Sequence, residues 1–344
     1  MSQTKNILLT FDYELFLGSR SGNARNCIIQ PTNELLKVLS EINAKAIFFV
    51  DILYLTRLRE ISVQHLQAQN DYTTIEEQII NIANSGHYVY LHLHPHWLDA
   101  VYKPEINQWD LSNTTRYSVC DLSQPETDDL LLKAYNHLNE ILLKSKVKPA
   151  IEGFRAGGLF IQPFEKFYHF FKQKNICYEF SVYPGFSSKS NNCVLDFSHA
   201  PSQRIYHFED DCCIVNPKGY FKEYSISQIH LSGLNRIINS FVFRFNTFIL
   251  EDKPWGSGKG AAHVISNNNK KVSLHGVVEE SASVELMNFW KNHTYYNYLK
   301  SESLLHLLSH PKLLSPHNLK ALRHFMYKVN KKYEVITDFK KFNL

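Results

Sequence analysis

The sequence predicts a parallel α/β fold, and three features of the chain support this class. Segments with strand character alternate with amphipathic helical segments, which is the pattern of β-α-β units. The expected strands are nearly continuous apolar runs, as in a sheet that is covered on both faces. The length of 344 residues suits a single α/β barrel, and a hydrophobic content of 44% is sufficient for its core.

Residues 1–160 show the clearest alternation. The apolar run NILLTFD ends at Asp12, and helical spacing from Pro31 onward leads to a second buried strand, KAIFFVDI. The next helix, TIEEQIINIANSG, stops at Gly86 and precedes the strand HYVYLHLH. An amphipathic helix, TDDLLLKAYNHLNEILLKS, is followed by the strand in KPAIEGFRAGG.

The second half of the chain is regular at its two ends. A helix, FEKFYHFFKQKN, precedes the strand ICYEFSVYPG, and the last elements alternate as SVELMNFWKNHTYYNYL, LLHLLSHP, HNLKALRHFMYKVNKKY and EVITDF. Between them, residues 185–275 contain short β-like pieces, RIYHF and CCIVNP, and an apolar segment near 236–250. We therefore expect one domain over residues 1–344 with an irregular insertion around 185–275.

Composition and charge exclude several classes of protein. A formal charge of +4 without a long basic run argues against a nucleic-acid partner. The apolar run ILLTF is shorter than the roughly 7 residues of a signal-peptide core, and no run approaches the ~18 residues of a transmembrane helix. The six cysteines contain no CxxC pair and are expected to be reduced thiols. These features predict a cytoplasmic protein without a transmembrane segment.

Several predicted strands end in side chains that can carry chemistry. In α/β barrels the catalytic groups lie at the carboxyl ends of the strands, so these side chains are expected to meet on one rim. Carboxylates, imidazoles and a guanidinium together indicate a metal-assisted hydrolytic site, although a carboxylate after a strand can also be a helix cap. The candidates in chain order are Asp12, Glu14, His92, His94, His96, Arg155 and His310.

At these residues the chain resembles the NodB-homology polysaccharide deacetylases, carbohydrate esterase family 4. TFDYE stands where that family usually has TFDDG, and AKAIFFVD is similar to its ATFFV strand. GHYVYLHLHPH matches the register of its H-[ST]-x-x-H motif, and FRAGG and LLSHP match the later arginine and histidine motifs. The variants associated with lipopolysaccharide and O-antigen gene products, with FDxE and RAGG, are the most similar. The resemblance is strong over residues 5–160 and weak over 185–275.

The resemblance implies a distorted (β/α) barrel, usually with seven strands. It also implies a metal-dependent N-deacetylase that hydrolyses the acetamide of an N-acetylated sugar in surface polysaccharide or lipopolysaccharide biosynthesis. The sugar is expected in free, nucleotide-linked or lipid-linked form. Zinc is the first candidate for the divalent metal, with cobalt, manganese and nickel as alternatives.

The ligands implied by the resemblance are Glu14, His92 and His96. Tyr13 stands in the position of the family's second aspartate and cannot replace it as a carboxylate ligand. The ligand is therefore assigned one residue further on, to Glu14, as in DxE variants. Asp12 remains the alternative carboxylate ligand.

The resemblance also assigns the proton-transfer groups. Asp12 matches the base, and Arg155 would orient it and hold its pKa down by charge pairing. His310 is the candidate general acid, and His275 and His199 are the competing histidines. The family's usual fourth motif, an acid paired with a tryptophan, is not found.

Two further residues of the histidine run are expected beside the metal rather than on it. Pro95 should end the strand near this point, so that His96 can turn back toward His92. His94 would then contact the substrate or support the site, with a purely structural role as the alternative. Trp97 is expected to contact the substrate as well.

Two alternative functions remain at this stage. One is hydrolysis of another non-peptide C–N amide bond. The other is a catalytically degenerate barrel that binds carbohydrate, which is motivated by Tyr13 and by the missing fourth motif. Convergence of Asp12, Glu14, His92 and His96 would count against the degenerate barrel.

Overall fold

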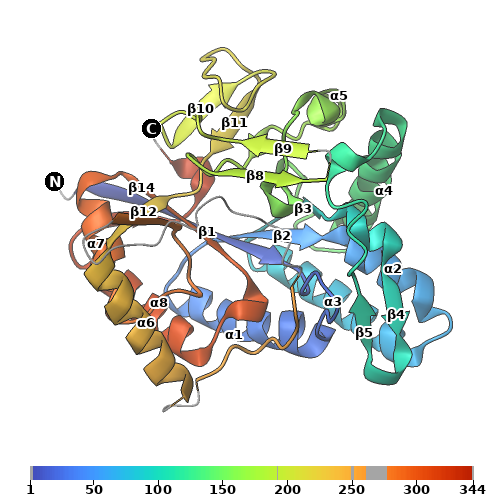
Figure 1. The fold of residues 1–344 in the computed structure, drawn as a ribbon, viewed down its shortest axis with the longest axis horizontal. Coiled ribbons are helices and arrows are strands. Elements are labelled where there is room, and N and C mark those ends of the chain that lie inside the picture. Colours follow the sequence, from blue (N-terminus) through green and yellow to red (C-terminus); the bar gives the residue numbers. More distant parts are fainter. Residues whose placement is uncertain (1–2, 192, 249–251, 261–276, 343–344) are drawn as a thin grey trace.

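One curled sheet with helices packed around it forms the body of the protein (Figure 1). The computed structural model describes residues 3–191, 193–248, 252–260 and 277–342. Within them the sheet has nine strands: eight follow the order β10-β11-β7-β6-β3-β2-β1-β14, and β15 pairs with the start of β1. Every pair in this sheet is parallel except β10 with β11. The strands are β1 (Thr4–Tyr13), β2 (Ile47–Asp51), β3 (Tyr88–Leu93), β6 (Gly153–Ala156), β7 (Tyr178–Glu179), β10 (Ile205–Phe208), β11 (Phe221–Tyr224), β14 (Leu304–Ser309) and β15 (Glu334–Ile336).

The helices alternate with these strands along most of the chain, which confirms the predicted α/β class. No helix in the described part of the chain is both long and apolar enough to cross a membrane. The helices are α1 (Gln30–Glu41), α2 (Ile52–Ser62), α3 (Leu66–Asn84), α4 (Gln124–Leu143), α5 (Glu165–Lys174), α6 (Gly233–Phe248), α7 (Lys291–Ser301) and α8 (Pro316–Asn330).

The expected seven-stranded barrel is not what the structure shows, because the sheet does not close through a ladder between β11 and β14. Irregular chain runs along the free edge of β14 instead. The backbone N–H of His306 donates to Ser227 Oγ at 2.9 Å, and the N–H of Leu308 donates to the carbonyl of Ala282 at 3.0 Å. Isolated hydrogen bonds from side chains and from the backbone, rather than a continuous ladder, therefore hold the two ends of the curled sheet together.

The alternation of side chains along each strand separates the inside of the curl from its outside. In β1, Ile7, Leu9 and Phe11 belong to the large cluster under the helices, whereas Leu8 belongs to a separate cluster inside the sheet. Asp12 follows Leu8 in the same alternation, so it also points inward. The inner face is thus apolar near the start of the strands and polar near their carboxyl ends.

Aromatic rings fill the apolar half of the interior. Phe339, from the last turn of the chain, lies 4.8 Å from the ring of Tyr88, 5.1 Å from Tyr178 and 5.3 Å from Tyr224. Edge-to-face contacts of this kind favour a dense, rigid packing. This end of the interior is closed, and the opposite end carries the polar groups.

The region expected to be an irregular insertion, residues 185–275, contributes β10 and β11 to the main sheet. It also forms the hairpin of β8 (Ser187–Ser190) with β9 (Cys193–Asp196) and the strand β12 (Gln228–Ser232). The latter pairs with β13 (Val277–Ser281), and α6 lies between the two strands in sequence. A further hairpin, β4 (Val101–Lys103) with β5 (Gln108–Asp110), follows the third strand of the sheet.

The structure also bears on the segment CCIVNP and on the cysteines. CCIVNP forms turns rather than a β-like piece, because the carboxylate of Asp211 accepts the N–H of Cys213 at 2.8 Å and its carbonyl accepts the N–H of Ile214. All six cysteines are unpaired, in line with the expected thiols.

Two buried carboxyl groups face each other on neighbouring strands. The register of β7 and β11 places Glu179 opposite Glu223, and both side chains are buried. Glu179 accepts the N–H and hydroxyl of Ser181 at 2.8 and 2.5 Å, and Glu223 Oε1 accepts the N–H of Val182 at 3.2 Å. Burial and the adjacent Glu179 raise the pKa of Glu223 well above its usual value.

This pair predicts that Glu223→Gln stabilises the protein at alkaline pH. Because the folded-state pKa of Glu223 is raised, the wild type has its full stability below the unfolded pKa and loses it as pH rises toward the folded pKa. The amide cannot ionise, so the difference in unfolding free energy between variant and wild type should grow by up to about 1.4 kcal/mol per pH unit. Urea unfolding between pH 5 and pH 9 measures it, and a difference independent of pH would contradict the assignment.

Candidate active site

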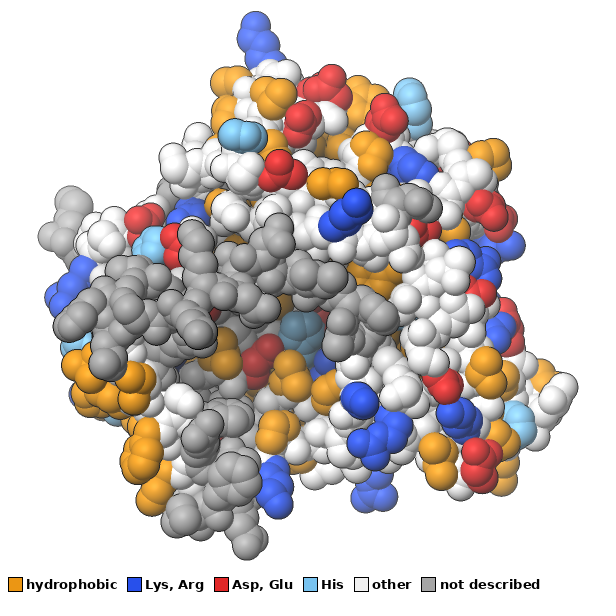
Figure 2. All heavy atoms as spheres, viewed as in Figure 1, with side chains coloured by type: hydrophobic (Ala, Val, Ile, Leu, Met, Phe, Trp, Pro, Cys, Tyr) orange, Lys and Arg blue, Asp and Glu red, His pale blue; other side chains and the backbone are white. Residues whose placement is uncertain are grey.

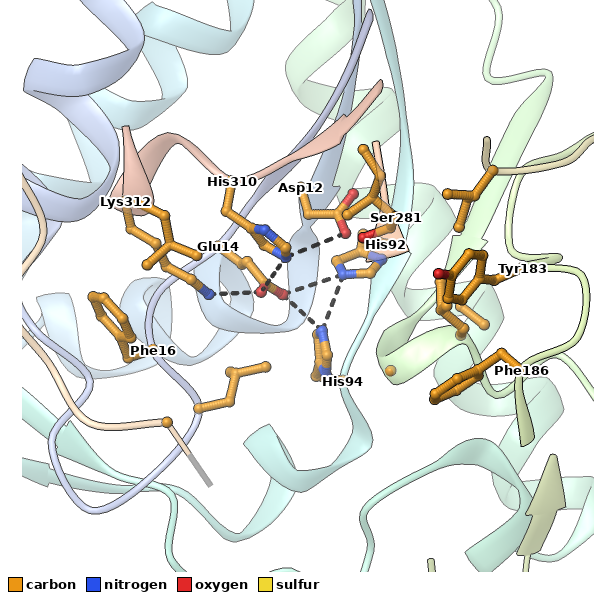
Figure 3. A pocket seen from close by; sticks show the side chains of 18 of the residues that line it. Asp12, Glu14, Phe16, His92, His94, Tyr183, Phe186, Ser281, His310 and Lys312 are labelled. Atoms are coloured by element: carbon orange, nitrogen blue, oxygen red, sulfur yellow. Dashed lines mark hydrogen bonds and ion pairs between the residues drawn. The ribbon is translucent and has the colours of Figure 1, made fainter. Parts of the chain in front are cut away.

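The polar end of the interior opens into a cavity of about 420 Å³. Its floor comes from the carboxyl ends of the central strands and from the loop after β14, which is where catalytic groups of α/β barrels are found (Figure 3). Tyr117, Tyr183 and Phe186 belong to its wall. The charged and titratable groups that line it are Asp12, Glu14, His92, His94, His310 and Lys312.

Three of these side chains converge on one point. Glu14 Oε2 lies 3.2 Å from Nε2 of His92 and 2.7 Å from Nε2 of His94, and the two nitrogens are 3.0 Å apart (Figure 3). All three side chains are buried. Burial would raise the pKa of Glu14, but Lys312 and the two imidazoles hold it well below its usual value. The glutamate is therefore an anionic donor.

The main chain sets the orientation of His92. Its Nδ1 lies 2.8 Å from the carbonyl oxygen of Arg155, so Nδ1 carries the proton that is donated to this oxygen. Nε2 is then the atom directed at Glu14. Burial opposes protonation, but Asp12 and Glu14 raise the pKa of His92 to about 9.

His96, a ligand expected from sequence, does not belong to this group. The donor atoms of Glu14, His92 and His94 all lie within 4.8 Å of one another, and this group does not include His96. The ring of His96 stacks on Tyr117 at 5.6 Å, and its two nitrogens have no hydrogen-bond partner in the described part of the chain. Burial and the neighbouring His94 lower the pKa of His96 to about 3.

The physical reason for this correction is the length of β3. The strand continues through Leu93, and His94 keeps an extended backbone with φ −120° and ψ 96°. His92 and His94 therefore point to the same side, toward the interior. The 3-10 turn Pro95–Asp99 begins only after His94 and carries His96 away from the cluster.

Trp97, expected to contact substrate, lies in the core instead. It is 0% exposed, and its ring packs against Tyr54 at 5.0 Å and Trp109 at 5.5 Å. Its Nε1 donates to Asp51 Oδ2 at 2.6 Å. The turn after Pro95 directs the side chain of Trp97 into the core. Trp97 therefore anchors the turn and does not line the cavity.

Asp51 is a buried acid beside the cluster that sequence reasoning missed. It ends β2 and pairs with His92 in the register of the sheet. Oδ2 of Asp51 accepts the hydrogen bond from Trp97 Nε1, whereas Oδ1 has no hydrogen-bond partner among the described residues. Burial raises the pKa of Asp51 to about 6, against the opposing effect of His94 and His92. Its position as the last residue of a buried strand was a signal that could have identified it.

Asp12 is held by Arg155, as expected from sequence. Arg155 Nη1 donates to Asp12 Oδ1 at 2.6 Å, and both side chains are buried. Burial would raise the pKa of Asp12, but Arg155, with His92 and His310, holds it below its usual value. Oδ2 faces the cavity, 3.7 Å from Nε2 of His310. Asp12 is thus an ionised carboxylate with one oxygen anchored and the other directed at the cavity.

The guanidinium has further partners that were not predicted. Arg155 Nη2 donates to Thr10 Oγ1 at 2.9 Å and lies 3.1 Å from Nε2 of His306. Nδ1 of His306 faces the carbonyls of Tyr224 and Ser225 at 3.0 and 3.1 Å, so Nε2 is the acceptor. Burial and Arg155 lower the pKa of His306 to about 3, which leaves the ring neutral at ordinary pH.

His310 follows β14 and reaches the same cavity. Its Nε2 lies 3.7 Å from Asp12 Oδ2 and 3.7 Å from Glu14 Oε1. On its other side, Glu285 Oε1 lies 3.1 Å from Nδ1, and Glu285 Oε2 accepts the backbone N–H of His310 at 2.8 Å. Burial opposes protonation, but Glu285 raises the pKa of His310.

His199 and His275 were the alternatives to His310 as the general acid. His199 is exposed and does not line the cavity. His275 lies outside the described residues. Of the candidates that the structure describes, His310 is therefore the one that faces the converging groups.

Lys312 is a second group that sequence reasoning missed. Its Nζ donates to Glu14 Oε1 at 2.6 Å and to the carbonyl of Leu15 at 2.7 Å. The lysine thus binds one oxygen of Glu14 and leaves the other to the two histidines. The residues HPK were visible after the strand LLHLLS, but the contact depends on the packing of that loop against the end of β1.

The donor set suits a divalent metal such as zinc. One carboxylate and two imidazoles form the three-ligand pattern of catalytic zinc sites, which leaves positions for water and substrate. Two Nε2 atoms only 3.0 Å apart also require a shared proton or a cation, because two lone pairs at this distance repel each other. The residues present therefore fit the metal that the sequence suggested.

Comparisons with solved structures find proteins of low sequence identity. One described as a polysaccharide deacetylase from Mycobacterium smegmatis is 14% identical, with a TM-score of 0.47 over 98% of this chain and 87% of that one. Another so described, from Pseudomonas aeruginosa PAO1, is 11% identical, with a TM-score of 0.48 over 97% and 87%. Puue allantoinase is 10% identical, with a TM-score of 0.44 over 97% and 86%.

Searches against protein-family models and curated proteins find no match. The roles proposed below therefore depend on the geometry of this chain.

Substitution of His94 and substitution of His96 should have opposite effects on metal binding. We expect His94→Ala to lose zinc after loading and dialysis, because it removes a converging donor. His96→Ala should retain close to the wild-type content, because that ring stacks on Tyr117 outside the cluster. Elemental analysis of folded protein, checked by circular dichroism, gives the comparison. Loss of zinc from His96→Ala alone would restore the ligand set expected from sequence.

Proposed function

We propose that this protein is a metal-dependent hydrolase of amide C–N bonds that removes the acetyl group from an N-acetylated sugar. Surface polysaccharide or lipopolysaccharide biosynthesis is the proposed setting. The observation that carries the proposal is one cavity floor that holds a donor triad, Glu14, His92 and His94, beside an anchored carboxylate and a carboxylate-supported histidine. A metal, a base and an acid are the components of metal-assisted amide hydrolysis.

The triad would hold the metal through Glu14 Oε2 and the Nε2 atoms of His92 and His94. When bound, a divalent ion polarises an amide carbonyl and lowers the pKa of a water molecule. The bond from His92 Nδ1 to the Arg155 carbonyl fixes the tautomer that directs Nε2 at the site. Lys312 neutralises part of the charge on Glu14 and limits its freedom to rotate.

Asp12 is the proposed base. Its Oδ1 is occupied by Arg155, so Oδ2 is the oxygen that takes the proton from the attacking water. The lowered pKa keeps this carboxylate ionised and ready to accept a proton. Arg155 acts as a positioning residue, because it holds Asp12 in one orientation and itself lies out of reach of the cavity.

His310 is the proposed acid. Glu285 holds its Nδ1, which leaves Nε2 facing the cavity. The raised pKa favours a protonated ring that can donate to the leaving amine as the C–N bond breaks. The amide nitrogen would then approach His310 Nε2 from the cavity side, and that atom lies 3.7 Å from Asp12 Oδ2 in this structure.

The rest of the cavity suits a sugar ring. A volume of about 420 Å³ lies in the range of small-molecule sites. Tyr117, Tyr183 and Phe186 provide aromatic surfaces for the apolar face of a pyranose. Glu14 and His92 converge beside Asp12 as the sequence led us to expect, with His94 in place of His96, and this arrangement favours catalysis over a degenerate barrel that only binds carbohydrate.

The test of this function is release of acetate from a panel of acetamido sugars by zinc-loaded protein. We expect Asp12→Asn to lower the rate by roughly 10²–10⁴-fold while zinc content stays at the wild-type level, because Asp12 acts on the proton and does not hold the metal. Asp129→Asn is the matched control, since Asp129 forms an exposed ion pair with Lys133 within one helix.

Two results would contradict the assignment. Full activity of Asp12→Asn would remove Asp12 as the base. Loss of zinc from Asp12→Asn, with zinc retained in Glu14→Gln, would make Asp12 the carboxylate ligand.

A further inference from the structure

Helix α6 exposes an apolar stripe on the surface. Leu234 is 60% exposed, Ile237 51%, Phe241 69% and Phe245 45%. Spacings of three and four residues place these side chains along one face of the helix. Isolated exposed apolar residues are common, but a continuous stripe of large ones marks an interaction surface.

The stripe continues onto the neighbouring loop. Phe289 is 54% exposed and Trp290 is 48% exposed, immediately before α7. Both residues and Asn235 of α6 line a second cavity of about 780 Å³, so the loop and the helix share one surface. Hydrophobic side chains gather over α6 at the lower left of the molecule (Figure 2). We call the exposed apolar residues of α6 together with Phe289 and Trp290 the α6 surface.

The helices next to the α6 surface carry basic side chains, of which Lys328 lines the second cavity. The sequences of α6, α7 and α8 contain no aspartate or glutamate. Lys300, Lys320 and Lys328 are exposed on α7 and α8, and Lys328 lines the second cavity. His293 and His324 line it too. An acidic group does lie nearby, since Glu279 of β13 is 3.4 Å from His230 at the edge of this cavity.

We propose that the α6 surface binds the surface of an anionic phospholipid bilayer. Exposed Leu, Ile, Phe and Trp side chains beside cationic residues are the composition of helices that lie in the membrane interface. The apolar stripe would enter the boundary of the acyl chains, and the lysines would lie at the level of the phosphates. The second cavity, with Lys328, His293 and His324, offers cationic and hydrogen-bonding groups to a phosphate headgroup.

A second copy of the chain suits this surface less well. A two-fold symmetric contact places each patch against its own counterpart. Lys328 of one copy would then lie near Lys328 of the other, which is unfavourable at short range. An anionic bilayer is complementary both to the stripe and to its surroundings.

The position of α6 gives this binding a consequence for the active site. Helix α6 lies in sequence between β12 and β13, which pair in a sheet of their own, and Ser281 at the end of β13 lines the catalytic cavity. Figure 2 shows the apolar side chains over α6 on the same face of the molecule as a hollow with acidic and histidine side chains. Docking would thus hold the cavity next to the bilayer. The proposal itself does not depend on the reaction proposed above.

The experiment is co-sedimentation of the full-length protein with vesicles of phosphatidylcholine, with and without phosphatidylglycerol. We expect binding to the anionic vesicles that weakens as salt is raised. Phe241→Ser/Phe245→Ser should reduce partitioning by on the order of tenfold or more, because it removes two inserted rings. Lys320→Glu/Lys328→Glu should abolish the preference for phosphatidylglycerol.

Val63→Ser/Leu66→Ser is the matched control. Val63 follows α2 and is 89% exposed, and Leu66 begins α3 and is 72% exposed, so both are exposed apolar residues outside the α6 surface. It should bind vesicles like the wild type. Failure of the wild type to bind anionic vesicles would overturn the proposal, and so would unchanged binding by the Phe241/Phe245 variant. A dimer in analytical ultracentrifugation that this variant abolishes, without vesicle binding, would assign the surface to a second copy.

Discussion

A buried arginine holds the polar end of this molecule together. Arg155 is 0% exposed, and an unpaired charge at such a position is strongly unfavourable. Asp12 supplies the counter-charge, His306 accepts a further N–H, and the guanidinium lies over the ring of Phe49 at 4.2 Å. The backbone of Arg155 has a separate role, because its carbonyl orients His92. One residue therefore determines the position of the proposed base and of one proposed ligand.

This constraint also explains why the interior is divided into two ends. The aromatic rings around Phe339 exclude water from below, so the groups above them depend on hydrogen bonds to one another. His306 is neutral because burial and Arg155 disfavour its charged form, and neutrality makes Nε2 an acceptor for the guanidinium. Breaking such a buried pair by removing one partner typically costs about 3–5 kcal/mol.

Much of this arrangement could be predicted from the sequence, because it depends on where strands end. Asp12, His92 and Arg155 each lie at the carboxyl end of a buried strand, and parallel strands bring these ends together. The choice between His94 and His96 could not be predicted in the same way. A match of motif spacing favoured His96, whereas the strand continues far enough for side-chain alternation to select His94.

The site residues that were not predicted differ in how far the sequence could have indicated them. His306 lies four residues before His310 in the alternation that runs along β14, so it points to the same side, and strand periodicity could have indicated it. Glu285 and Lys312 reach the site only because loops far apart in sequence pack together. The stripe of α6 had an amphipathic sequence, but the exposure of Leu234, Ile237, Phe241 and Phe245 is a property of the folded chain.

A crystal structure of zinc-loaded protein with anomalous diffraction at the zinc edge would test the proposed metal site most directly. We expect one zinc peak between Glu14, His92 and His94, with Lys312 still bound to the other oxygen of Glu14. A zinc ion held by His96 in place of His94, or a loaded crystal without a peak at these residues, would contradict the assignment of these three ligands.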